Sequence, residues 1–201
     1  IIENWNMYFT FDREDFLYSS SMGKLFPNMH ENEELILFRK GIRCLYSKGN
    51  KALYHYDLNS FKINESRTIE DTWSANYLIA QYFNSIEDVS IIRNVLKNAN
   101  IGDYYEDRLN WYYGISILSP YWRKAIGDYK IIVSDLSGYF IEEQKNSNVY
   151  VVGLDLAKQI KKSFPDVIVL GLMDDSSTGA IKEVEETPKQ NLSLIHISEP
   201  T

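Results

Sequence analysis

Asp135 stands at a position in the sequence where a carboxylate can do chemistry. It closes the run 129–134, whose central residues are apolar without interruption, as in a strand that is buried on both faces. In an open parallel sheet, ligands bind beyond the carboxyl ends of the strands. A carboxylate placed there can coordinate a hard cation such as Mg²⁺, or attack phosphorus and become an aspartyl phosphate. Alternatively, Asp135 caps the turn that follows its strand.

Four further acids are candidate companions of this carboxylate, because phosphoryl transfer requires a metal ion and additional negative groups around it. Glu87 and Asp88 precede an apolar stripe at helical spacing, so they are equally well placed as first-turn acids that face a helix dipole. Asp174 and Asp175 follow a later apolar run and could join a metal site. Adjacent acids of this kind more often belong to a solvated loop or a helix cap.

The elements around Asp135 are typical of a parallel sheet. Residues 153–164 have apolar side chains at helical spacing, and Pro165 ends that pattern. A second uninterrupted apolar run, 167–170, is closed by Gly171. Strand, helix and strand in this order predict a βαβ unit with a right-handed crossover, in a sheet that is covered on both faces.

Helices are also expected upstream of this unit. Residues 71–83 can form a helix, although 77–80 could equally be a short strand. Residues 85–99 form a clearer helix, for which Ser85 is the expected N-cap, with Asp88 three residues later as in a capping box. Ser119 and Pro120 predict the start of a short helix that ends near Ile126.

The first 70 residues have a different pattern. Residues 1–34 show no clear element, whereas 35–38, 42–46 and 52–56 are expected strands of a small antiparallel meander, with a turn at 47–51 where Gly49 and Asn50 are available for a positive φ. His55 is interpreted as an ordinary strand position. The expected fold is therefore α/β: a partial Rossmann-like parallel sheet in 71–190, preceded by a β-rich region in 1–70.

Composition narrows the classes of function. The net charge of −7 argues against a broad nucleic-acid interface, which needs a basic face. Cys44 is the single cysteine, which fits a reducing, cytoplasmic compartment, and the lack of a Cys/His cluster argues against structural zinc. No apolar run approaches the length of a membrane span.

Residues 192–201 resemble the translation of a sequencing adapter rather than native protein. The chain also begins with Ile1 instead of Met. We therefore expect 191–201 to be a non-native tail and the rest to be an internal piece of a longer protein.

Three segments together resemble a response-regulator receiver domain. They are the acid-containing segment 87–96, the strand and Asp of 131–136, and the helix and strand of 153–170. The resemblance implies a phosphoryl-accepting Asp135, Mg²⁺ held by Glu87, Asp88 and Asp135, and a phosphodonor kinase or another protein as partner.

The chain departs from the receiver pattern at several positions. Residues 81–86 are a poor first strand, and the segment between Asp135 and Gly153 is longer than receivers usually show. Gly171 stands where a receiver has Thr or Ser. The final receiver strand and its Lys do not precede the adapter-like tail.

The segment 130–140 is also similar to the first motif of haloacid-dehalogenase-type phosphatases, in which the first Asp is the nucleophile. Ser137 replaces the second Asp of that motif, and Tyr139 replaces its Thr. Ser cannot transfer a proton near neutral pH as a carboxylate can, so this resemblance implies a degenerate, inactive copy.

A receiver-like regulatory domain is the leading expectation, and the degenerate phosphatase is the first alternative. The other alternative is a non-catalytic interaction module that binds a partner through its aromatic surface, since the chain contains 15 Tyr, nine Phe and four Trp.

Overall fold

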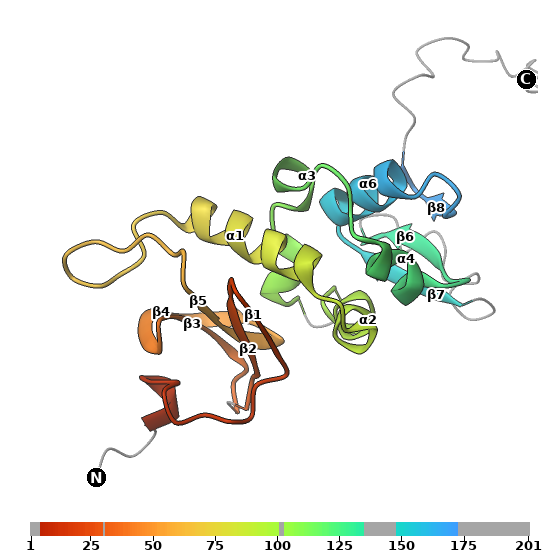
Figure 1. The fold of residues 1–201 in the computed structure, drawn as a ribbon. Coiled ribbons are helices and arrows are strands. Elements are labelled where there is room, and N and C mark those ends of the chain that lie inside the picture. Colours follow the sequence, from red (N-terminus) through yellow and green to blue (C-terminus); the bar gives the residue numbers. More distant parts are fainter. Residues whose placement is uncertain (1–4, 30, 101–102, 135–147, 173–201) are drawn as a thin grey trace, which may run out of the picture.

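The computed structural model describes residues 5–29, 31–100, 103–134 and 148–172. It is a mixed α/β structure with a five-stranded sheet, a three-stranded sheet and helices between them (Figure 1). Within these described residues, no helix combines the length and the apolar character needed to cross a lipid bilayer.

The larger sheet is mixed rather than a simple antiparallel meander, so the predicted connectivity is wrong. Its strands run in the order β1-β2-β5-β3-β4. The central pair, β3 and β5, is parallel, because the chain crosses from β4 past β3 before it forms β5. The strands are β1 (Tyr18–Ser20), β2 (Gly23–Pro27), β3 (Glu34–Arg39), β4 (Ile42–Lys51) and β5 (Tyr54–Leu58).

The hairpin between β3 and β4 turns at Lys40 and Gly41, which both have positive φ, as a two-residue hairpin turn of this kind requires. The predicted turn at 47–51 is instead the end of β4. Gly49 does have the expected positive φ of 81°, but it lies where the register of β3 and β4 shifts, and so it forms a bulge.

Residues 5–17 cross the outer face of the five-stranded sheet, the face turned away from α1, and we call them the N-terminal strap. The strap begins with η1 (Trp5–Met7), and Phe9 forms a β-bridge with Ile42. The Thr10 hydroxyl donates to the buried Asp57 carboxylate at 2.6 Å. The first 34 residues therefore contain elements that the sequence pattern did not predict, because their strands are short and their side chains pack on distant parts of the chain.

Two long helices follow the sheet. The first, α1 (Thr72–Ser85), begins at Asp71, whose side chain accepts hydrogen bonds from two backbone N–H groups, so the helical reading of this segment is confirmed. The second, α2 (Val89–Asn98), begins at Asp88 rather than at the predicted Ser85. Ser85 is the last residue of α1, where its hydroxyl donates to the Tyr82 carbonyl.

Shorter helices connect α2 to the second sheet. They are η2 (Tyr105–Arg108), α3 (Trp111–Gly114) and α4 (Pro120–Ile126). Ser119 and Pro120 start α4 as predicted, with Pro at the first helical position.

The second sheet is parallel, as predicted, but it contains a strand, β7, that was not predicted. The order is β7-β6-β8, made of β6 (Lys130–Val133), β7 (Val149–Val152) and β8 (Val169–Leu170). The predicted helix is confirmed as α6 (Leu154–Ser163). It connects β7 to β8, which lie on opposite sides of β6.

One hydrophobic core extends through both sheets and the helices between them, and it crosses the expected boundary near residue 70. Phe83 on α1 contacts the Tyr56 ring of β5 with a centroid distance of 5.8 Å and the Trp111 ring at 5.9 Å. Trp111 in turn meets the edge of Trp122 at 5.1 Å. These buried aromatic side chains pack the five-stranded sheet against the helices that precede the second sheet.

Candidate functional site

The carboxyl edge of the parallel sheet is the place that the sequence pointed to. β6 is the central strand, and its last residue, Val133, is level with Val152 at the end of β7. Ser134 leads out of β6 directly into Asp135. Asp135 itself lies outside the described residues, as do Asp174 and Asp175. The structure thus describes the strand that precedes Asp135 in the sequence.

A different carboxylate, Asp107 in η2, is positioned at this edge. Its Oδ1 atom accepts a 2.7 Å hydrogen bond from the backbone N–H of Gly153, which links β7 to α6. Its Oδ2 atom accepts one from the Asn100 side chain at 3.3 Å. Because the N-terminus of a helix carries a partial positive charge, the carboxylate is also favoured electrostatically at the start of α6.

Close packing accompanies this hydrogen bond. A Cβ atom on Gly153 would lie 3.0 Å from Asp107 Oδ2 and 3.1 Å from the Asp107 carbonyl oxygen. Glycine thus allows η2 to approach the sheet edge, although the φ of Gly153, −62°, is open to any residue.

The neighbouring residue of η2, Glu106, points into the core between η2 and the five-stranded sheet. Its carboxylate accepts the Leu53 N–H at 3.0 Å and a short hydrogen bond from the Tyr56 hydroxyl. The side chain is fully buried, and burial raises the pKa of Glu106 to about 7, although these hydrogen bonds pull it the other way.

Glu87 and Asp88, the predicted metal ligands, are both exposed. The Asp88 side chain caps α2: it accepts the Ser90 N–H at 2.8 Å and the Ser90 hydroxyl at 2.7 Å. The hydrogen bonds from the Ser90 hydroxyl and backbone lower the pKa of Asp88.

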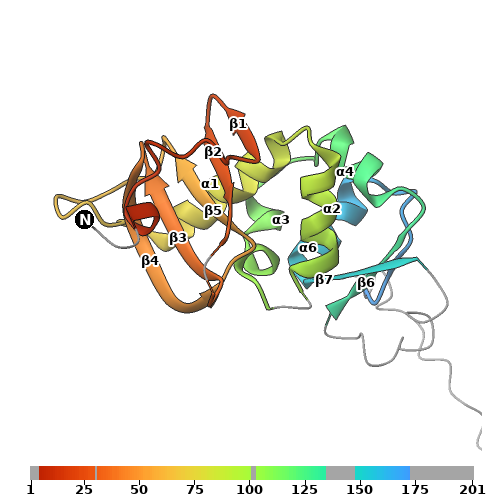
Figure 2. The ribbon, with the colours of Figure 1, turned by 90° about the horizontal axis from the view of Figure 1, so that it is seen from below.

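The opposite end of α2 reaches the carboxyl edge, because Asn100, just beyond the helix, binds Asp107. The ten residues of α2 span roughly 15 Å between these ends. Figure 2 shows the N-terminal end of α2 as the one turned away from β6 and β7. A Mg²⁺ site shared by Glu87, Asp88 and Asp135 stays a prediction, and the part of the chain with described coordinates contains no cluster of three His, Cys, Asp or Glu side chains suited to a metal.

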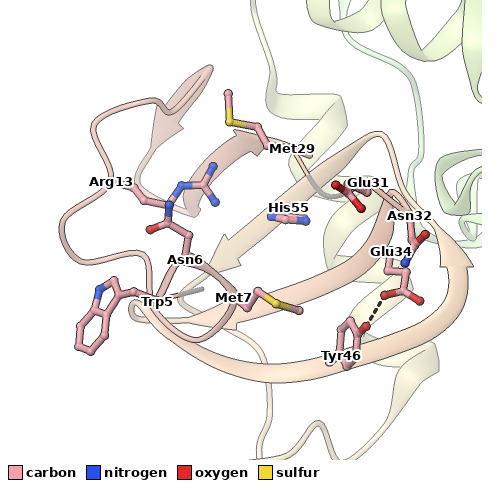
Figure 3. Close-up of a pocket in the computed structure, with 10 residues that line it drawn as sticks. All are labelled: Trp5, Asn6, Met7, Arg13, Met29, Glu31, Asn32, Glu34, Tyr46 and His55. Atoms are coloured by element: carbon pink, nitrogen blue, oxygen red, sulfur yellow. Dashed lines mark hydrogen bonds between the residues drawn. The ribbon is translucent and has the colours of Figure 1, made fainter. Parts of the chain in front are cut away.

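A second feature that the sequence did not indicate is a pocket of about 680 Å³ between the N-terminal strap and the outer face of the five-stranded sheet (Figure 3). His55, interpreted from sequence as an ordinary strand position, lines it and is only 2% exposed. Arg13 and Glu34 line it as well.

Sequence reasoning missed Asp107 because its partner Gly153 is distant in the chain, and it missed Arg13 because the pocket that Arg13 lines is formed by segments far apart in sequence. One signal was present: Gly153 precedes an amphipathic helix but has no side chain with which to cap it, so a capping group from elsewhere is required. The pattern alone does not identify Asp107 as that group.

Comparison with known proteins adds no family to this description. No protein-family model matches the chain, and neither a curated protein nor a solved structure matches it significantly. The function is therefore argued from the sequence and the geometry alone.

Proposed function

We propose that the parallel part of the chain is a receiver-like regulatory domain with a Rossmann-like arrangement, in which Asp135 accepts a phosphoryl group. The observation that carries the proposal is the place of β6. It is the middle strand of a parallel sheet, its residues Ile131 to Val133 are buried, and at the carboxyl edge it leads into Ser134, the residue before Asp135 in the sequence.

The chemistry requires an exposed carboxylate and a place for the incoming charge. A carboxylate oxygen of Asp135 attacks the phosphorus of a donor, the bond from phosphorus to the donor's leaving group breaks, and an aspartyl phosphate remains. A divalent cation such as Mg²⁺ would offset the charge of the phosphoryl oxygens. A partner kinase would supply the phosphoryl group, and the product would act as a signal rather than a metabolite.

The geometry suggests which described residue would respond to modification at this edge. Asp107 binds Gly153, which lies one residue beyond the end of the strand that neighbours β6. A doubly charged phosphoryl group close to this edge would repel the Asp107 carboxylate. The proposed signal is therefore a displacement of η2, which would also alter the hydrogen bonds of the Glu106 carboxylate.

The arrangement upstream differs from a receiver. The segment expected to contain the first receiver strand, residues 81–86, belongs mostly to the helix α1. The strand that lies beside β6 on that side of the sheet is therefore β7 and not a strand from this segment. The proposal thus rests on β6 and its carboxyl edge and not on the complete receiver pattern.

Phosphorylation of the whole chain tests the proposal. Incubation with acetyl phosphate and Mg²⁺ should add one phosphoryl group by intact-mass spectrometry, and the Asp135→Asn variant should remain unmodified. Asp128→Asn, an exposed acid before β6, is the matched control and should be modified like the wild type. Absence of the adduct in the wild type, or its persistence in Asp135→Asn, would overturn the proposal. Hydrolysis of p-nitrophenyl phosphate that depends on Asp135 would favour the phosphatase-like alternative.

The interaction-module alternative has an observation of its own. Several large apolar side chains of the N-terminal strap are exposed, namely Trp5, Tyr8, Phe11, Phe16 and Leu17. Clustered exposed aromatic side chains are typical of protein-binding surfaces. If a second copy of the chain is the partner, sedimentation velocity should show self-association that the Phe16→Ser and Leu17→Ser variants abolish. If the protein is a monomer at all concentrations, a second copy of the chain is not the partner.

A further inference from the structure

The pocket beneath the N-terminal strap has opposite charges on two of its sides. Figure 3 shows the Arg13 guanidinium on one side of His55 and the carboxylates of Glu31 and Glu34 on the other. Charges separated in this way across one pocket match a ligand that is itself dipolar.

The positive side is held rigidly. The Arg13 guanidinium lies 4.4 Å from the centre of the Phe26 ring, and its side chain is only 7% exposed. Asp15 accepts two hydrogen bonds, from Nε at 2.9 Å and from Nη2 at 2.8 Å, and the Pro27 carbonyl accepts a longer one. The Nη1 atom donates no hydrogen bond to the described residues, so two guanidinium donors remain for a carboxylate ligand.

The negative side combines one buried and one exposed acid. Glu34 is 8% exposed, and its carboxylate is oriented by the Tyr46 hydroxyl and by the Gly49 N–H, which lies 3.3 Å from Oε1. Glu31 is exposed and forms no ion pair with any residue that the structure describes. An ammonium group placed between these carboxylates would find acceptors on two sides.

The floor and the roof of the pocket come from different parts of the chain. His55 on β5 forms the floor beside Phe38, with ring centroids 6.1 Å apart. The roof comes from the N-terminal strap, which is fastened to the sheet where Thr10 donates to Asp57. A pocket of about 680 Å³ is of the size used for small organic ligands, which occupy about 300–1,000 Å³.

We propose that this pocket binds a zwitterion, namely an amino acid or a short peptide with two charged termini. Arg13 would bind the carboxylate through Nη1, while Glu31 and Glu34 would receive the ammonium group. The apolar side chains of Met7 and Met29 line the same pocket and would contact the ligand's side chains. The proposal is independent of Asp135, because, among the described residues, no strand of the parallel sheet lines this pocket.

Calorimetric titration of the whole chain with dialanine and dileucine tests this assignment. The matched ligands are the N-acetyl and C-terminal amide forms of each dipeptide, in which one charge is removed. Loss of a charged hydrogen bond costs roughly 1.5–3 kcal/mol, so each blocked form should bind at least about tenfold more weakly. Equal binding of blocked and unblocked dipeptides would overturn the proposal, and so would the absence of binding by all of them at millimolar concentration.

Variants locate the binding to this pocket. Glu31→Gln should weaken the binding of unblocked dipeptides and leave the binding of the N-acetyl forms unchanged. Because Glu31 is exposed, this substitution should not disturb folding. Glu65→Gln, in an exposed turn whose residues do not line the pocket, is the control and should bind like the wild type. Arg13→Lys keeps a charge but loses the fork of donors, so it should weaken the free-carboxylate forms more than the amides. Binding by Glu31→Gln and Arg13→Lys that equals the wild type would place the ligand elsewhere.

Discussion

The Asp107 carboxylate and the Gly153 backbone N–H form a 2.7 Å hydrogen bond across 46 residues of chain. This contact attaches η2 to the start of α6 and to the carboxyl edge of the parallel sheet. Because Asp107 is half-buried there, its loss leaves the Gly153 N–H without its protein acceptor.

Removal of the Asp107 carboxylate should destabilise the protein. Loss of this charge-assisted hydrogen bond and of the helix-terminus interaction costs about 1–3 kcal/mol, so Asp107→Ala should lower the free energy of unfolding by that amount. Urea denaturation followed by far-UV circular dichroism measures it. Asp128→Ala is the control, because that side chain is exposed, and its effect should be within about 0.5 kcal/mol.

A methyl group on Gly153 should force η2 away from the sheet edge. The added Cβ would meet Asp107 at 3.0 Å, so Gly153→Ala should destabilise the wild type more than it destabilises the Asp107→Ala background. A double-mutant cycle of unfolding free energies should show coupling of about 0.5 kcal/mol or more. If the changes in unfolding free energy of the two variants are strictly additive, residue 153 and the Asp107 side chain do not pack closely.

Glu106 should make stability depend on pH. Its pKa is raised by burial to about 7 in the folded protein from an ordinary value of 4.5, so the folded state binds the proton more tightly than the unfolded state does. The free energy of unfolding should therefore fall as pH rises from 4.5 to about 7, by up to about 3 kcal/mol, and then level off.

Denaturation curves across this pH range check the direction of the effect. Glu106→Gln should flatten the slope, whereas the exposed Glu65→Gln should retain it. A wild-type stability that rises steadily between pH 5 and 7 would contradict an unusually high proton affinity of Glu106.

Asp88 provides a test of capping against metal binding. Asp88→Ala should cost about 1 kcal/mol because the first turn of α2 loses its cap, and Asp88→Asn should cost only a few tenths because Asn is as good a cap. Unfolding free energies measured with and without Mg²⁺ distinguish the roles. A Mg²⁺-dependent stabilisation that Asp88→Asn removes would instead establish Asp88 as a ligand.

The N-terminal strap should loosen when Thr10 loses its hydroxyl. Thr10 is 3% exposed and donates to Asp57, whose carboxylate also accepts the Gly41 N–H at 2.9 Å. Thr10→Val leaves this buried carboxylate with one donor fewer, at a cost of about 1–3 kcal/mol. Amide hydrogen exchange should increase in the strap but not in α6, and the exposed Thr68→Val should leave both unchanged.

Local pattern was sufficient for part of this structure. The apolar spacing of 153–164 predicted α6, and the Ser–Pro pair predicted the start of α4, because these signals depend on neighbouring residues. The uninterrupted apolar runs correctly indicated parallel strands. β7 was missed although its sequence, Val-Tyr-Val-Val, is an uninterrupted apolar run like 167–170, because the receiver resemblance treats the segment between Asp135 and Gly153 as one long connection.

Other features depend on long-range packing that a single sequence does not display. The pairing of β3 with β5 is set by how the chain crosses the sheet, and the strap becomes ordered through Thr10 and Asp57, which are far apart in sequence. The same holds for the candidate site. The sequence indicates Asp135 because an apolar strand precedes it. The residues next to Asp107 give no sign that its side chain lies at the carboxyl edge of the parallel sheet, because that position depends on the fold of the whole chain. Asp88 was expected as an acid of the first helical turn, but it is itself the N-cap of α2, and Ser85 is not the cap.

Glu106 and Asp107 are consecutive residues of η2 whose side chains bind different parts of the fold. The Glu106 carboxylate lies in the core beside the five-stranded sheet, and the Asp107 carboxylate lies at the carboxyl edge of the parallel sheet. Thermodynamic reciprocity then applies to η2. If a ligand that binds beside Gly153 displaces Asp107 and thereby alters how strongly Glu106 holds its proton, protonation of Glu106 alters the affinity for that ligand to the same degree. The chain would take up or release a fraction of a proton on binding, and the heat of binding would vary with the ionisation enthalpy of the buffer.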